Sequence, residues 1–541
     1  MARLDLLVTG GDVVDGTGSP SRPTDVGVRD GRLVLLPPGS RTSAAEVIDA
    51  TGLVVTPGFI DVHTHSDLLA GDDEQREVLR RAPLLQGVTT EICGNCGISP
   101  FPVPPQRTEP VRELIAATFG PPASAYGSFG EFADAQGVAR RNHLAALVGH
   151  GTLRAAVVGF AQRRATPAEI QSMCDLLDGA LAAGAAGLST GLIYSPGVNA
   201  GTDEVIALAR VAAAHGKPYV THLRDEMSQV ESALEEAIEI ATAAGSALQV
   251  SHHKTAGRRA WGATVRTLAR LEQARADGLD VTCDVYPYTA GSTALHAMLP
   301  PWLIADGVPA MLAAAAAEPA VRDRIRHDLA AGVPGWENTV GNGGWDLIRV
   351  ASASNNPDAQ GHTIADLAAA RGVDPVDYAC ELLAAEHGDV TILSHSMHED
   401  DVRRVLASPL TMLCSDGVPK GGRPHPRWAG SFTRVLGHYV RDVGLLDLAG
   451  AVHKMTGMPA ARFGLRDRGL LADGYAADLV VLDPQTVADG ATYDDPLAPP
   501  QGVRCVLVGG RVVVDGGAVT DARPGRVLAV PDRQRAVPGP R

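Results

Sequence analysis

The stretch Gly58-Phe59-Ile60-Asp61-Val62-His63-Thr64-His65-Ser66-Asp67 decides the fold that we expect for this chain. Its first half is apolar and follows Pro57, which is typical of a short buried strand. Side chains two residues apart on a strand point to the same side, so His63 and His65 would face one point just beyond the strand end. Two imidazoles placed in this way suit one metal ion. A pair of polar histidines without a metal would explain the spacing equally well.

Length and composition indicate a large globular protein. The 541 residues suit a large barrel with a smaller module, and 45% hydrophobic with 20% charged residues predicts a well-buried core. The formal net charge of -15, without any basic stripe, argues against a nucleic-acid partner. We expect no membrane partner, because no apolar run of about 18 residues occurs. We expect no signal peptide, because residues 1–5 lead directly into a strand-like segment without an apolar core. The 7 scattered cysteines argue against a disulfide framework and indicate a reducing cytoplasm.

Both ends of the chain carry short strands that we expect to pair into one small β-sandwich. Asp30-Gly31 divides the apolar run 26–34, which is a strong hairpin signal. Gly509-Gly510 stands between apolar runs in the same way as Gly10-Gly11. Neither end has enough strands to be stable alone. We therefore assign the sandwich to residues 1–56 and 471–525, the main domain to 57–470, and a loose tail to 526–541.

Between the two ends, strands alternate with helices, and this alternation predicts a parallel (β/α)8 barrel of the TIM type. Thr166-Pro167-Ala168-Glu169 carries the N-cap, the N1 proline and the capping-box glutamate of a helix start. Residues 296–345 break the alternation, which predicts a helical insertion after strand seven and a candidate lid. One of nine candidate strands is surplus, and we leave out 390–393. Besides 58–62, the candidates are 87–92, 144–148, 187–190, 218–221, 247–251, 280–284, 390–393 and 410–414.

Residues just past the carboxyl ends of barrel strands converge on one mouth, where the loops carry the chemistry. A combination of nitrogen, sulfur and oxygen ligands at that place suits zinc, whereas magnesium or calcium would favour oxygen. Each such residue alone has an ordinary structural explanation, but their joint position predicts a metal site. The candidate ligands are His63, His65, Cys96, His222, His252 and Asp416.

These motifs resemble those of the amidohydrolase superfamily and, within it, the D-aminoacylase (N-acyl-D-amino-acid deacylase) family, over nearly the full length. The opening motif 58–67 and the segment 474–480 are general superfamily features. The narrower matches are Gly94-Asn95-Cys96-Gly97, Ser251-His252-His253-Lys254 and His425-Pro426-Arg427. The resemblance implies a distorted barrel with a small β-sandwich made from both termini, in agreement with the strand pattern.

The resemblance also implies which candidate ligands bind which metal ion. It places one tightly bound zinc ion on Cys96, His222 and His252. It places a second, weaker metal position at His63, His65 and Asp416, with Cys96 bridging the two. Zinc lowers the pKa of bound water towards about 7. Asp416 would accept the proton of this water and pass it to the leaving amine, unless it serves as a ligand only.

The resemblance further implies a set of residues that bind the α-carboxylate of the substrate. Cationic and hydroxyl groups suit a carboxylate, although tyrosines near strand ends often pack in the core. Arg427 stands out because no acidic residue lies near it in the sequence. The set is Arg427, Lys254, Tyr286, Ser292 and Tyr194.

The expected function is hydrolysis of N-acyl-D-amino acids to a carboxylate and a free D-amino acid, with zinc as the cofactor and a small molecule as the partner. A cyclic-amide hydrolase of the hydantoinase type, or another C–N hydrolase of the superfamily, is the alternative. A non-enzymatic scaffold is a third class, which the intact ligand set argues against. The sequence leaves the substrate side chain and the oligomeric state open.

Overall fold

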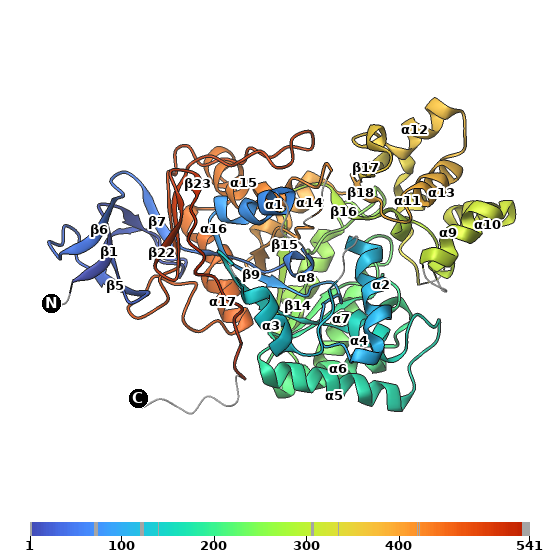
Figure 1. Ribbon diagram of the computed structural model, residues 1–541, viewed down its shortest axis with the longest axis horizontal. Coiled ribbons are helices and arrows are strands. Elements are labelled where there is room, and N and C mark those ends of the chain that lie inside the picture. Colours follow the sequence, from blue (N-terminus) through green and yellow to red (C-terminus); the bar gives the residue numbers. More distant parts are fainter. Residues whose placement is uncertain are drawn as a thin grey trace.

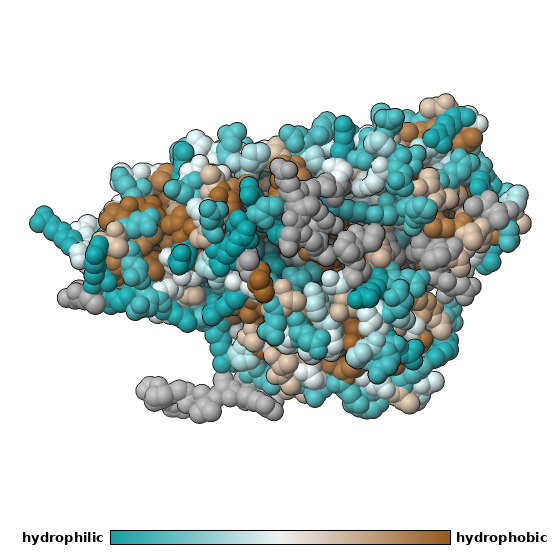
Figure 2. Space-filling view, in the orientation of Figure 1, coloured by the Kyte–Doolittle hydropathy of each residue, from teal (hydrophilic) through white to brown (hydrophobic). Residues whose placement is uncertain are grey.

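The computed structural model describes residues 3–69, 74–119, 124–138, 140–304, 308–333, 335–418, 420 and 422–532. Figure 1 shows three parts: a β-sandwich at the left, a barrel of strands and helices in the centre, and an inserted helical unit at the upper right. The face drawn in Figure 2 is mostly hydrophilic, with smaller hydrophobic areas. Within the described ranges, no helix has the length and apolar character that a membrane crossing requires.

The central part is a parallel barrel, as the alternation of strands and helices predicted. Two parallel sheets contribute to it, in the orders β10-β9-β8 and β11-β12-β13-β14-β15-β19. The strands are β8 (Phe59–Asp61), β9 (Val88–Cys93), β10 (His143–Ala146), β11 (Val148–Gly149), β12 (Leu188–Gly191), β13 (Tyr219–His222), β14 (Leu248–Val250), β15 (Val281–Val285) and β19 (Thr411–Leu413).

The barrel is closed but irregular. The predicted strand 144–148 is divided at Leu147, whose backbone N–H donates to Cys93 O on one side at 2.9 Å, while the next residue bonds to Gly187 O. On the opposite side the ring closes between the ends of β8 and β19, where the backbone N–H of Asp416 donates to His63 O at 2.8 Å. This closure brings two candidate ligands together through the backbone alone.

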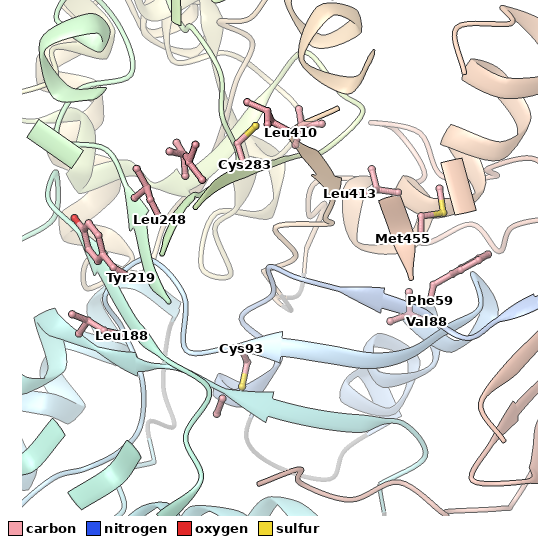
Figure 3. Packing of buried hydrophobic residues seen from close by; sticks show 14 of the residues in the cluster. Phe59, Val88, Cys93, Leu188, Tyr219, Leu248, Cys283, Leu410, Leu413 and Met455 are labelled. Atoms are coloured by element: carbon pink, nitrogen blue, oxygen red, sulfur yellow. The ribbon is translucent and has the colours of Figure 1, made fainter. Parts of the chain in front are cut away.

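Side chains alternate between the two faces of the barrel strands, as expected for strands covered by helices on the outside. Phe59, Val88 and Leu188 belong to the large outer layer, and Figure 3 shows them among the buried side chains of this cluster. Ile60 follows Phe59 in β8, and Ser189 follows Leu188 in β12, so both point to the other face of their strands. Ile60 belongs to a second cluster of buried side chains, inside the barrel. The outer helices include α1 (Glu74–Leu85), α4 (His150–Val157), α5 (Pro167–Ala183), α6 (Thr202–Ala214), α7 (Val230–Ala244), α8 (Thr264–Ala276), α14 (Glu399–Ala407), α16 (Leu448–Met455) and α17 (Gly457–Phe463).

The predicted helix start at Thr166 is confirmed. Thr166 Oγ1 accepts the backbone N–H of Glu169 at 3.3 Å, and Glu169 Oε2 accepts the backbone N–H of Thr166 at 2.8 Å. This reciprocal pair satisfies two backbone donors at the start of α5 that would otherwise lack partners.

The two chain ends form the predicted β-sandwich. One sheet, in the order β5-β4-β1-β6, is N-terminal, whereas the other, β23-β22-β21-β20-β7-β2-β3, takes strands from both ends. The Asp30-Gly31 hairpin is confirmed, but Gly10-Gly11 leads the chain from one sheet to the other. The strands are β1 (Leu4–Thr9), β2 (Asp12–Val13), β3 (Arg22–Pro23), β4 (Asp25–Arg29), β5 (Arg32–Leu36), β6 (Ala44–Asp49), β7 (Val54–Pro57), β20 (Leu479–Leu482), β21 (Val503–Val508), β22 (Arg511–Asp515) and β23 (Ala518–Val519).

The first part of the predicted tail is not loose. Leu528 and Val530 are buried, and their backbone N–H groups donate to Leu144 O at 2.7 Å and Gly184 O at 2.8 Å. Asp532 Oδ1 lies 3.0 Å from His215 Nδ1. These apolar and hydrogen-bonded contacts fix residues 526–532 to the barrel, while residues 533–541 lie outside the described ranges.

The helical insertion after strand seven is confirmed, but it is longer than the predicted 296–345. It has its own apolar core, which runs from Leu295 to Ile392. The surplus candidate 390–393 forms β18 in the antiparallel sheet β16-β18-β17 of this unit, so its exclusion from the barrel is confirmed. The elements are β16 (Gly291–Ala294), α9 (Val308–Ala317), α10 (Pro319–Ala331), α11 (Thr339–Gly343), β17 (Ile348–Ser352), α12 (Ile364–Arg371), α13 (Pro375–Ala385) and β18 (Thr391–Ser394).

Candidate active site

The structure brings all six candidate ligands to one end of the barrel. Each follows or ends a different parallel strand, except that one strand supplies two histidines. All six side chains are buried, so water competes little for their donor atoms. They come from the loop after β8 (His63, His65), the loop after β9 (Cys96), the end of β13 (His222), the loop after β14 (His252) and the loop after β19 (Asp416).

Cys96 Sγ is the centre of the cluster. It lies 3.3 Å from His63 Nε2, 3.5 Å from His252 Nε2 and 3.8 Å from His222 Nδ1. Ligands bound about 2.0–2.3 Å from one tetrahedral zinc ion are about 3.3–3.8 Å apart, so these separations fit a shared ion. Burial raises the pKa of the Cys96 thiol well above its usual value, and its thiolate form therefore needs a cation beside it.

Asp416 completes the cluster on the side of β8. Its Oδ1 lies 3.4 Å from His63 Nε2 and 3.5 Å from His65 Nε2. The donor atoms of His63, Cys96, His252 and Asp416 all lie within 4.8 Å of one another. Because Cys96 contacts histidines on both sides, the arrangement is compatible with one ion or with two that share this sulfur. The assignment of each residue to a tight or a weak position stays a prediction.

Three of the six residues have a left-handed backbone, which residues other than glycine rarely adopt. The φ angles are 52° for Cys96, 33° for His252 and 48° for Asp416. Around Cys96 the turn also requires small neighbours, because a Cβ on Gly94 would lie 2.2 Å from Leu147 O. Such conformations cluster where the surrounding structure fixes a side chain for function. They direct these donors into the cluster at the barrel mouth.

Sequence reasoning missed Asp284, the acidic residue near the end of β15. Its Oδ1 accepts the backbone N–H of His252 at 2.8 Å and lies 3.6 Å from His63 Nδ1. Burial alone would raise the pKa of Asp284, but the hydrogen bond and charge of His63 lower it overall. A carboxylate at the far nitrogen of a metal-binding histidine fixes its tautomer and ring orientation. The available signal was its position, since it ends strand seven as other candidate ligands end their strands.

Sequence reasoning also missed Glu226, in the loop after β13. One oxygen lies 3.1 Å from His252 Nδ1, and the other lies 3.5 Å from His222 Nε2. Glu226 Oε2 also accepts a hydrogen bond from Lys254 Nζ at 2.6 Å. The two histidines and Glu226 could together hold a metal ion, but the ammonium group of Lys254 supplies the positive charge at this position. No pattern in the sequence marks this loop glutamate.

The five candidate substrate-binding residues line the cavity in front of the cluster, together with parts of the inserted unit. Arg427 stacks over the ring of Tyr286 at 4.5 Å, and Lys254 lies 5.9 Å from the same ring. The ring of Tyr194 lies 5.3 Å from that of His222. Arg427 also donates weakly to the backbone oxygen of Ser292, at 3.5 Å. These contacts place cationic and hydroxyl groups beside the donor cluster.

Arg427 has an acidic partner that its local sequence does not reveal. Its Nη1 lies 2.7 Å from Asp416 Oδ2, and both side chains are buried. Burial alone would raise the pKa of Asp416, but Arg427 and the nearby His252 hold it well below its usual value. The pairing arises because the helix α15 (Arg427–Arg434) begins where the loop after β19 returns to the mouth. Asp416 therefore stays ionised at neutral pH.

We expect Glu226→Gln to weaken zinc binding by about 10–100-fold, because the far nitrogens of His252 and His222 lose their carboxylate. Competition with a chelator measures this affinity without an assay of turnover. Asp225→Asn is the matched control, since Asp225 caps the same loop through the backbone N–H groups of Met227 and Gln229 and contacts neither histidine. Equal weakening in both variants would show that loop stability, and not the Glu226 carboxylate, is responsible.

Fold and site together define a class: a (β/α)8-barrel protein with a candidate metal centre of histidine, cysteine and aspartate at the barrel mouth. A model of the amidohydrolase family matches residues 46–514. The chain therefore belongs to the amidohydrolase family.

Known proteins resemble the chain over nearly its full length. It is 40% identical to a D-aminoacylase and 38% identical to an N-acyl-D-glutamate deacylase, both from Alcaligenes xylosoxydans xylosoxydans; each match spans 97% of this chain, and 97% and 96% of the relatives. Among solved structures, the N-acyl-D-glutamate deacylase of Bordetella bronchiseptica, complexed with zinc and a phosphonate inhibitor, matches with a TM-score of 0.81 and 38% identity. That match covers 98% of this chain and 100% of the solved chain.

Proposed function

We propose that the chain is a zinc-dependent hydrolase that cleaves the amide bond of N-acyl-D-amino acids and releases a carboxylate and a free D-amino acid. The observation that carries this proposal is one cavity that is lined both by residues of the Cys96-centred donor cluster and by the Arg427–Asp416 pair. The first can hold zinc, and the second can supply a base and bind a carboxylate. The similarity to D-aminoacylase and N-acyl-D-glutamate deacylase supports the same reaction.

The proposed ligands of a tightly held zinc ion are Cys96, His222 and His252. His63, His65 and Asp416 form a second, weaker position, which shares Cys96. A bound zinc ion supplies Lewis acidity, which acidifies a water molecule and polarises the amide carbonyl. Asp284 and Glu226 hold the rings of His63, His252 and His222 in orientation through the nitrogens that face away from Cys96.

Asp416 is the proposed acid–base residue. Its Oδ1 faces the donor cluster, while its Oδ2 is held by Arg427 Nη1 at 2.7 Å. The carboxylate would accept the proton of the attacking water and deliver it to the nitrogen of the leaving amine.

The α-carboxylate of the substrate is proposed to bind between Arg427 and Lys254, with Tyr286, Ser292 and Tyr194 around it. Both cations lie against the ring of Tyr286, so they border one space. A planar guanidinium suits a carboxylate because two parallel N–H groups can bind it. This arrangement favours linear substrates with a free carboxylate over simple hydantoins and dihydropyrimidines, which carry none.

The expected partner is accordingly a small molecule. We also propose a cytoplasmic location. All seven cysteines are free thiols, and a protein that keeps buried thiols and uses one of them as a ligand suits a reducing compartment.

Zinc-loaded protein is expected to hydrolyse N-acetyl-D-amino acids and to hydrolyse the matching L-forms at least about 100-fold more slowly or not at all. A fixed carboxylate site and a fixed base together accept one configuration at the α-carbon. Release of the free amino acid, measured for both enantiomers of each substrate, checks this result. Turnover of a hydantoin or dihydropyrimidine without any deacylation would instead support the cyclic-amide alternative. Exclusive activity on L-substrates would contradict the proposal.

A further inference from the structure

The cavity in front of the donor cluster has few positive charges. Among the described residues that line it, the cations are Lys254 and Arg427. Both are already bonded to carboxylates, Lys254 to Glu226 at 2.6 Å and Arg427 to Asp416 at 2.7 Å. The internal stretches outside the described ranges contain no lysine or arginine, so they add no further cation. One α-carboxylate would use the capacity that these two cations have left.

The basic loop after Asp416 does not change this balance. Its sequence, Val418-Pro419-Lys420-Gly421-Gly422-Arg423, carries two positive charges. Lys420, however, forms an ion pair with Asp389 in the inserted unit, and neither Lys420 nor Arg423 lines the cavity. Among the described residues of this loop, Val418 lines the cavity, and it is apolar.

A group of apolar side chains, here called the apolar wall, also lines the cavity beside the donor cluster. Phe119, at the end of α2 (Thr108–Phe119), lies with its ring 4.8 Å from that of His65. Ile193 stands beside Tyr194, whose ring packs on His222. The helix α2 also packs against β16 of the inserted unit, which bounds this part of the cavity. The wall consists of Ile98, Phe119, Ile193, Met298 and Val418.

Three carboxyl groups already line the cavity. Glu226 and Asp416 line it together with Glu337 of the inserted unit, whose Oε2 accepts the backbone N–H of Glu226 at 2.6 Å. Burial, together with the charges of Glu226 and Asp225, raises the pKa of Glu337 to about 8. The surroundings of Glu337 thus disfavour its ionised form. The same surroundings would also disfavour an ionised carboxylate on the side chain of a substrate.

We propose that the substrate side chain is uncharged and apolar, so that N-acyl derivatives of D-leucine, D-methionine and D-phenylalanine are preferred over those of D-glutamate and D-aspartate. This inference rests on the proposed function and names its substrate class. Overall similarity does not decide the matter, because the chain is 40% identical to a D-aminoacylase and 38% identical to a D-glutamate deacylase. The decision comes from the charges and the apolar wall of this cavity.

The test compares kcat/KM of the zinc-loaded full chain for the N-acetyl derivatives of D-leucine, D-methionine, D-phenylalanine, D-glutamate, D-aspartate and D-lysine. The apolar substrates are expected to exceed the acidic ones by about 100-fold or more, since a second buried carboxylate would have no cation left. If the acidic substrates or the lysine derivative are turned over best, this inference is wrong while the proposed function stands. No turnover of any of the six would contradict the proposed function itself.

A pair of variants tests the charge argument separately. Ile193 is half-buried on the apolar wall, so a longer side chain has room to extend into the cavity. Ile193→Arg is expected to raise the ratio of kcat/KM for N-acetyl-D-glutamate to that for N-acetyl-D-leucine by about tenfold or more, because it supplies the missing cation. Ile193→Gln is the matched control, of similar polarity but without charge, and should leave this ratio within about threefold of the wild type. An equal rise in both variants would overturn the charge argument.

Discussion

Cys96→Ala is expected to lose the tightly bound zinc and the hydrolytic activity together. Cys96 Sγ contacts His63, His222 and His252 at once, at 3.3–3.8 Å. Without it, two or three imidazoles remain, and no thiolate neutralises the charge of the ion. We expect zinc content to fall from about one ion per chain to nearly none, and kcat/KM to fall by about 10³-fold or more. Metal analysis after dialysis and a deacylation assay measure the two effects.

Cys93→Ala is the matched control for this variant. Cys93 is equally buried and lies three residues earlier, but its thiol faces Ala145 O at 3.4 Å in the outer layer of the barrel. The Cys93→Ala variant should lose about 1 kcal/mol of unfolding free energy, because the substitution leaves a small cavity. Its zinc content should stay unchanged. Similar loss of zinc in both variants would mean that packing of this strand, and not the sulfur ligand, holds the ion.

The same experiment separates the two proposed metal positions. His63→Ala should reduce activity but leave about one zinc ion bound, because Cys96, His222 and His252 remain. His65→Ala should behave in the same way, since His65 contacts Asp416 at 3.5 Å and belongs to the weaker position. If His63→Ala alone empties the site, the division into a tight and a weak position is wrong, and His63 is a ligand of the tight ion.

The barrel and the six donors could be predicted because each signal is local. A parallel strand shows its apolar run, and a residue at its carboxyl end lies at the mouth whatever the rest of the chain does. Cys96, His222, His252 and Asp416 all followed from this rule. Asp284 satisfies it too, and was missed because a strand-ending aspartate alone does not reveal the two histidines that it contacts.

The contacts that were missed depend on pairs of segments far apart in the sequence. Glu226 holds two histidines from a loop without regular structure, and Arg427 pairs with Asp416 across the turn from β19 to α15. The inserted unit was predicted too short because its sheet pairs β16 with β18, which lie about one hundred residues apart. Antiparallel pairing over such a distance produces no recognisable pattern in the sequence. The residues after about 525 were assigned to a loose tail because they are rich in proline and arginine, yet buried Leu528 and Val530 anchor the segment 526–532 to the barrel.

Asp416→Asn is expected to abolish most of the activity while the zinc ion stays bound. Asparagine has nearly the same volume, and its amide oxygen can still accept a hydrogen bond from Arg427, now 2.7 Å from Asp416 Oδ2. It cannot accept the proton of the attacking water, and a positioned general base contributes about 10²–10⁴-fold to the rate. We expect kcat to fall by this factor. Steady-state kinetics with an N-acetyl-D-amino acid, together with metal analysis, measure the result.

The behaviour of KM and of zinc content distinguishes a base from a ligand. If Asp416 acts on the proton, kcat falls, KM changes little and about one zinc ion remains, because Cys96, His222 and His252 hold it. If Asp416 serves mainly as a ligand, the zinc affinity falls with the rate, and excess zinc restores activity. If Asp416 mainly fixes Arg427, its replacement raises KM for the carboxylate substrate more than it lowers kcat. Retention of more than about one tenth of wild-type kcat in the zinc-loaded variant would contradict the base role, since that loss lies well below the range for a general base.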